Sequence, residues 1–133
     1  MATDLFPSNF PSELAGSALV KGDEVAWQPS SAAVAVEWLG AHGYAVLGTE
    51  LWLITADGAI QSLPVGPSGR REVHGNTVDR EEGESWSTFV SRAATETVAY
   101  LRSFNPGDIV ERGELYFNVV WVGESEYKSL VSA

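Results

Sequence analysis

The segment 44–63 constrains the fold more than any other part of the chain, because it has the pattern of a β-hairpin. Residues 44–55 alternate along a long strand, and Asp57-Gly58 supplies the positive φ angles that a tight hairpin turn needs. Residues 59–63 return as a second strand, which Pro64 ends. One face of the first strand would carry Ala45, Leu47, Thr49, Leu51 and Leu53. The sequence therefore predicts a sheet with at least one antiparallel pair.

Two helices are predicted on either side of this hairpin. The first spans 31–41, with Ser30 or Ser31 as its cap and glycines at its end. Its apolar face would carry Val34, Ala35, Trp38 and Leu39. The second helix would begin after a Ser85 cap and stop at Asn105-Pro106-Gly107. Its apolar stripe consists of Trp86, Phe89, Val90, Ala93, Thr97, Tyr100, Leu101 and Phe104.

Residues 114–122 form the last predicted strand, and both of its faces are mostly apolar, which indicates a central strand covered on both sides. With a short strand at 24–27, the order is roughly (β)αββαβ. We therefore expect an α+β fold: a single small domain with two helices on an antiparallel or mixed sheet of three to five strands. Residues 1–23 are expected to be an irregular lead-in in which Phe6, Phe10 and Leu14 can pack on the body. The domain proper is expected at 24–122, followed by a polar tail at 123–133 that frays.

Charge and composition narrow the classes of partner. The 133 residues include 18 acidic and 8 basic side chains, for a net charge of −10, which argues against nucleic-acid and anionic-membrane partners. The chain has no cysteine, so disulfides and thiolate metal sites are excluded. The longest apolar stretch, 115–122, is far short of the roughly 20 residues of a membrane helix, and the first residues lack a signal-peptide pattern. We expect a cytoplasmic protein without a cofactor.

The polar segment 66–84 contains the densest acidic run of the chain. Asp79, Glu81, Glu82 and Glu84 precede the second predicted helix, where carboxylates favour the positive end of the helix dipole. They lack the spacing of a calcium loop, so the alternatives are a hydrolase acid/base pair, a charged contact surface and plain solvation. None lies on a predicted apolar stripe, so replacing all four by serine is expected to leave the fold intact. A loop of this length is usually functional or mobile.

Glu50 is the other candidate binding residue. It lies in the long strand next to Gly48, and an acid there must be paired, hydrogen-bonded or facing water. Gly48 indicates either a bulge or the close approach of another backbone. One interpretation is a charge on an edge strand, and the alternative is a small-molecule site or enzyme cleft formed by Glu50, His42 and the 66–84 loop. His42 and His74 lack metal-ligand spacing, so no metal site is predicted.

The order of the motifs resembles a family of small bacterial immunity proteins from polymorphic-toxin systems, the immunity protein forty family. The matching segments are 45–52, 86–90, 99–104 and 114–120, within a similarity that covers about residues 30–122. The sequence departs from the family pattern where Thr49 replaces the second glycine of a Gly-Gly-Asp/Glu motif. The resemblance implies a cytoplasmic, non-enzymatic protein that binds and neutralises a cognate toxin. The acidic charge agrees with a basic target such as a nuclease.

Overall fold

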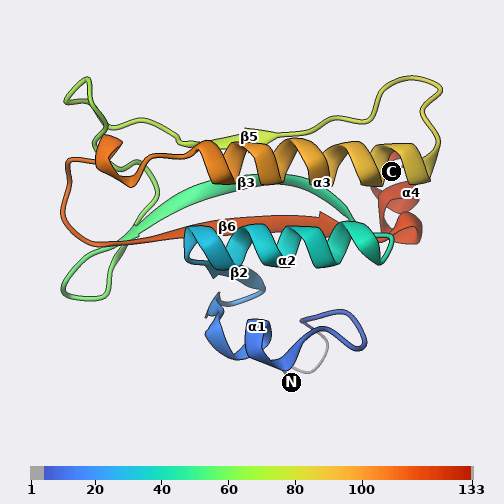
Figure 1. Cartoon of the computed structure of the whole chain (residues 1–133), viewed down its shortest axis with the longest axis horizontal. Coiled ribbons are helices and arrows are strands. Elements are labelled where there is room, and N and C mark those ends of the chain that lie inside the picture. Colours follow the sequence, from blue (N-terminus) through green and yellow to red (C-terminus); the bar gives the residue numbers. More distant parts are fainter. Residues whose placement is uncertain (1–4, 133) are drawn as a thin grey trace.

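The computed structural model describes residues 5–132 and places an antiparallel sheet beneath two long helices (Figure 1). The strands are β1 (Leu19–Lys21), β2 (Glu24–Trp27), β3 (Ala45–Ile54), β4 (Ile60–Gln61), β5 (Gly75–Thr77) and β6 (Glu114–Val122). The helices are α1 (Ser12–Ser17), α2 (Pro29–Ala41), α3 (Trp86–Ser103), the 3-10 turn η2 (Pro106–Asp108) and α4 (Glu124–Ser132). The predicted α+β class is confirmed.

The sheet has the order β1-β2-β6-β3-β4, and every pairing in it is antiparallel. β6 lies between β2 and β3, as expected for a central strand, and pairs with β3 along almost its whole length. The β3–β4 hairpin forms where Asp57-Gly58 predicted it, although β4 is shorter than the predicted strand 59–63. β5 pairs with the same edge of β3 as β4, but near the middle of that strand, at Gly48–Glu50, whereas β4 pairs with its last two residues.

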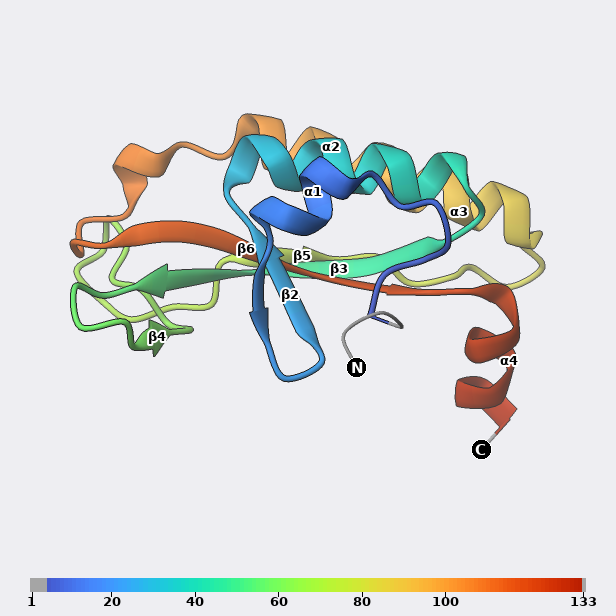
Figure 2. The same cartoon turned by 90° about the horizontal axis from the view of Figure 1, so that it is seen from below.

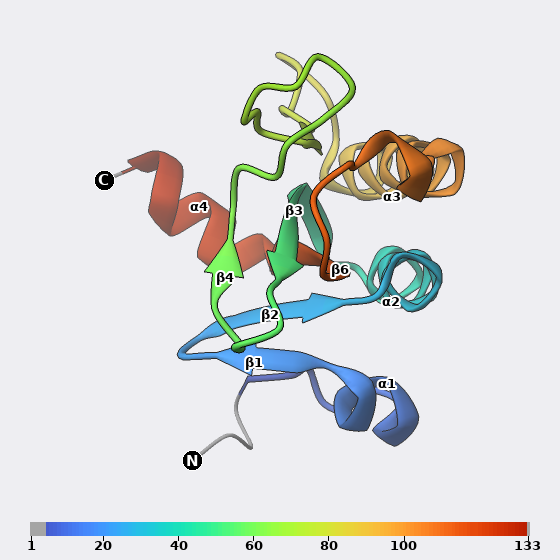
Figure 3. The same ribbon diagram turned by 90° about the vertical axis from the view of Figure 1, so that its left-hand side faces the viewer.

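The main core lies between the sheet and helices α2 and α3, which pack side by side when seen end-on in Figure 3. Phe117 of β6 is fully buried there, and its ring meets those of Tyr100 and Phe104 edge-on at 5.9 and 5.0 Å. The predicted stripe of α3 is confirmed, with Phe89, Val90, Ala93, Thr97 and Leu101 buried. The predicted cap is also confirmed, because Ser85 Oγ accepts a hydrogen bond from the Thr88 amide at 3.2 Å.

Helix α2 starts two residues earlier than predicted. Gln28 is its N-cap and Pro29 its first residue, where the missing amide of proline costs no hydrogen bond. The predicted serine caps, Ser30 and Ser31, are therefore wrong and lie inside the first turn. Val34 is 51% exposed, because the face of α2 turned to the sheet is offset from the predicted stripe and carries mainly alanines.

The predicted irregular lead-in contains helix α1 and strand β1, so its description as irregular is wrong from Ser12 onward. The expectation that its aromatic residues pack on the body is confirmed. Phe6 stacks on Phe10 at 5.0 Å, and both contact Trp27 at centroid distances of 6.3 and 5.9 Å. Trp27 Nε1 donates a hydrogen bond to the Leu14 carbonyl at 2.7 Å. Trp27 is fully buried, so its indole N–H needs a hydrogen-bond acceptor, and the carbonyl of Leu14 in the lead-in supplies it.

The predicted fraying tail is helix α4, and that prediction is wrong for the described residues. Tyr127 packs against Trp86 and Phe89 with ring centroids 5.4 and 5.7 Å apart, and the Arg80 guanidinium lies 5.5 Å from the Tyr127 centroid. A single aromatic residue in a polar segment is a weak signal in sequence. Its packing against rings at the start of α3 nevertheless holds α4 in place.

β6 is only partly covered on the side away from the helices. In Figure 2, α2 and α3 lie on one side of the sheet, while the tip of the β1–β2 hairpin and α4 project from the other. Asn118 is buried on that side, but Val120 is 44% exposed. The expectation that both faces of this strand are fully covered is therefore wrong, and a depression remains beside β6.

Candidate functional site

The acidic run before α3 is arranged around Arg92. Glu84 binds the Arg92 guanidinium with both oxygens, at 2.8 Å each, and Arg92 also donates to the Asp79 carbonyl at 2.6 Å. Glu84 Oε1 accepts a further hydrogen bond from the Glu81 amide at 2.9 Å. These bonds fasten the turn 79–84 to the helix, and the side chain of Glu84 is only 6% exposed.

The bonds to Arg92 are the main reason that the pKa of Glu84 falls from 4.5 to about 2, and the Glu81 amide adds to the effect. The expectation that all four acids share one exposed surface is therefore wrong for Glu84, whose carboxylate holds the fold together. Asp79, Glu81 and Glu82 are exposed, although Glu81 lies within 3.5 Å of Arg92. These three remain candidates for a contact surface.

Glu50 does not lie on a free edge, so the edge-strand interpretation is wrong. It is paired with Asn118 of β6 on one side and with Gly75 of β5 on the other. Its carboxylate is half-buried and accepts a hydrogen bond from Trp52 Nε1 at 3.1 Å. Trp52 is itself buried, so Glu50 satisfies the one polar atom of that indole.

β5 fills part of the space in which the sequence suggested a cleft. It forms within the 66–84 segment, which was expected to lack regular structure, and docks where Gly48 allows its backbone to approach. A Cβ at Gly48 would collide with the Asn76 carbonyl oxygen. Gly48 also adjoins a bulge in the pairing of β3 with β6. Both structural roles suggested for this glycine are therefore confirmed.

A chain of polar side chains joins β5 to its neighbour β3 and to α3. Thr49 Oγ1 donates to Asn76 Oδ1 at 2.6 Å, and Asn76 Nδ2 donates to Thr97 Oγ1 at 3.0 Å. Thr97 is fully buried and Thr49 nearly so. This Thr49–Asn76–Thr97 chain gives Thr49 a bonding role that a glycine at that position could not have.

The two histidines do not meet Glu50 as a catalytic pair would. His42 stacks on Trp38 with a centroid distance of 3.8 Å at the end of α2. Glu50 is five residues beyond the start of β3, which is about 16 Å along the strand at about 3.3 Å per residue. His74 is next to β5, where its carbonyl accepts the Leu51 amide at 2.7 Å, and its Nε2 is buried without a hydrogen-bond partner in the described residues. No group of three potential ligand side chains among residues 5–132 could hold a metal ion.

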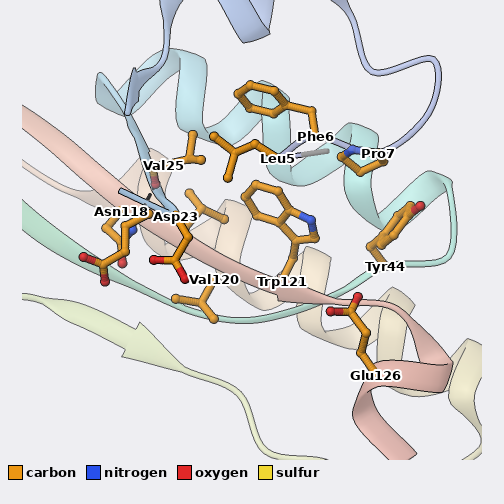
Figure 4. A pocket seen from close by; sticks show the side chains of 12 residues that line it. Leu5, Phe6, Pro7, Asp23, Val25, Tyr44, Asn118, Val120, Trp121 and Glu126 are labelled. Atoms are coloured by element: carbon orange, nitrogen blue, oxygen red, sulfur yellow. Dashed lines mark hydrogen bonds between the residues drawn. The ribbon is translucent and has the colours of Figure 1, made fainter. Parts of the chain in front are cut away.

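Sequence reasoning missed a groove of about 510 Å³ beside β6, drawn in Figure 4. It lies between the tip of the β1–β2 hairpin and the start of α4. It is lined by Leu5, Phe6, Pro7, Asp23, Glu24, Val25, Tyr44, Asn118, Val119, Val120, Trp121 and Glu126. The groove joins aromatic rings to three carboxylates. Its residues come from five separate segments, so no local pattern could have revealed it.

Comparison of the chain with protein-family models, curated proteins and solved structures finds no match. None of the helices formed by residues 5–132 has the length and apolar character needed to cross a membrane. The functional conclusion therefore depends on the charge, the surfaces and the motifs of this chain.

Proposed function

We propose that this protein binds and neutralises a basic protein toxin in the bacterial cytoplasm, as immunity proteins do, and that it does so without catalysis. The observation that carries the proposal is the net charge of −10, which leaves many carboxylates without a basic side chain to pair with. Such a surface attracts a basic protein over distances of about a Debye length and raises the rate of association.

Three exposed acids, Asp79, Glu81 and Glu82, support this function at one end of the molecule. They project from a turn that Glu84 and Arg92 hold on α3, so they form a fixed cluster. A fixed cluster of like charge favours an oppositely charged partner and loses little conformational entropy on binding.

The direct test is rescue of growth. A toxin candidate encoded by the neighbouring gene would be expressed in a bacterial host with and without this chain. We expect growth only with the chain, and a complex of the two purified proteins on size-exclusion chromatography. If the chain neither restores growth nor forms a complex with that toxin, the proposal fails for this pair.

The role of the exposed acids is tested by the association rate. Changing Asp79→Asn, Glu81→Gln and Glu82→Gln together should slow association by up to about tenfold at low salt, with the difference vanishing at high salt. Glu84 is kept, because its loss would release the turn.

A matched control removes three exposed acids elsewhere, Glu13, Glu72 and Glu114. It changes the net charge equally and should slow association less. Equal rates for both variants would mean that only net charge matters and that the 79–82 cluster has no special part.

A further inference from the structure

The groove beside β6 combines the two features that bind an arginine side chain. Figure 4 shows the Trp121 indole between the carboxylates of Asp23 and Glu126, with Tyr44 along the same wall. A guanidinium is planar, donates paired hydrogen bonds to carboxylates and stacks on aromatic faces. Carboxylates flanking aromatic rings therefore fit arginine better than a neutral or acidic group.

The carboxylates of the groove have acceptor capacity to spare. Asp23 is exposed at the hairpin tip and lines the groove, so its carboxylate is open to a partner. Glu126 uses Oε1 to accept the Gly123 amide at 3.2 Å, which caps α4 and leaves Oε2 for a partner. Glu24 is opposite Lys21 in the hairpin register, so its charge is partly balanced.

A buried amide at the inner end of the groove adds an independent observation. Asn118 is only 5% exposed and lines the groove beside Asp23. Its Nδ2 donates to the Val25 carbonyl at 3.0 Å, while Oδ1 accepts no hydrogen bond from the described part of the chain. Oδ1 is not a buried unpaired atom, so it is a solvent-accessible acceptor in the groove, and a guanidinium supplies five donors.

We infer that this groove receives an arginine side chain from a surface loop of the basic partner protein. The inference rests on the proposed function and names the surface through which it acts. The groove volume of about 510 Å³ lies within the range of roughly 300–1,000 Å³ typical of ligand sites. The net charge of −10 supplies the complementarity, and the exposed acids at 79–82 form a second acidic surface outside the groove.

The test uses a short peptide in place of the unidentified partner. Acetyl-Gly-Arg-Gly-amide would be titrated into the full chain to millimolar concentration and followed by NMR. The signals observed are the Trp121 indole N–H and the Asn118 side-chain amide. Both should shift, and acetyl-Gly-citrulline-Gly-amide, which has the same shape without the charge, should shift them far less.

A pair of identical substitutions locates the binding. Asp23→Asn should weaken binding of the arginine peptide by up to about fivefold, the effect of one solvent-accessible ion pair. Asp108→Asn makes the same chemical change on an exposed acid outside the groove and should leave binding unchanged.

Three results would overturn the inference: equal binding of the citrulline peptide, equal effects of the two aspartate variants, or shifts centred on residues 79–82. Groove signals that move on dilution without peptide would assign the groove to a second copy of this chain and also overturn it. The titration requires no toxin, so its failure with growth rescue intact refutes only the groove. Loss of rescue with peptide binding intact refutes only the toxin partner.

Discussion

Replacing Thr97 by valine should destabilise the protein, because it removes the hydroxyl oxygen that accepts the last hydrogen bond of the Thr49–Asn76–Thr97 chain. Valine has nearly the shape of threonine, so the change leaves packing in place but strands the Asn76 Nδ2 donor, now 3.0 Å from Thr97 Oγ1. A stranded buried donor costs about 1–3 kcal/mol, and the lower part of that range, about 1–2 kcal/mol, applies because Asn76 is only half-buried.

The cost translates into a measurable change of melting temperature. An unfolding entropy of about 2.1 cal/mol/K per residue gives about 0.28 kcal/mol/K for 133 residues, so the expected drop in Tm is about 4–7 °C. The assay is thermal unfolding by circular dichroism, supported by urea titration to obtain the free energy of unfolding.

Thr95→Val is the matched control, because Thr95 is exposed on the same helix and the substitution is identical. It should change stability by less than about 0.5 kcal/mol. If both variants unfold at the same temperature, the polar chain does not stabilise the docking of β5, and this reasoning is wrong.

Two further predictions concern the close backbone approach at Gly48 and the ion pair of Glu84. Gly48→Ala should lower the free energy of unfolding by about 1–3 kcal/mol, because the new Cβ would collide with the Asn76 carbonyl oxygen. Gly16→Ala in α1 is the control: its Cβ meets no atom within 4 Å, so the free energy of unfolding should stay the same or rise by up to about 1 kcal/mol. Urea titrations measure both changes. The pKa of Glu84 is lowered from 4.5 to about 2 by Arg92, so its stabilisation is complete above about pH 4.5 and is lost as the pH falls towards 2. Tm measured from pH 6 to pH 2 should therefore fall less steeply for Glu84→Gln than for the unchanged protein, and parallel curves would contradict this assignment.

How much of the candidate site could be predicted from the sequence depends on how far apart in the chain the contacting residues lie. The acidic run at 79–84 is visible in the sequence, but its division into three exposed acids and one clamped acid is not. Glu84 and Arg92 lie eight residues apart, and their bond depends on how the turn folds back on α3. The groove is further beyond sequence reasoning, since Asp23, Trp121 and Glu126 meet only after the whole chain has folded.

The sequence by itself determined the elements whose signal lies in neighbouring residues. The apolar strand segments of β3 and β6, the stripe of α3 and its Ser85 cap all reflect burial or hydrogen bonding within a few positions. Only the tertiary structure decided that α1, β5 and α4 form, because each is short and is stabilised by distant partners: Trp27 for the lead-in, Thr97 for β5 and Trp86 for α4. A short segment cannot offset its loss of conformational entropy alone, so whether it becomes ordered depends on the surface that the rest of the fold offers it.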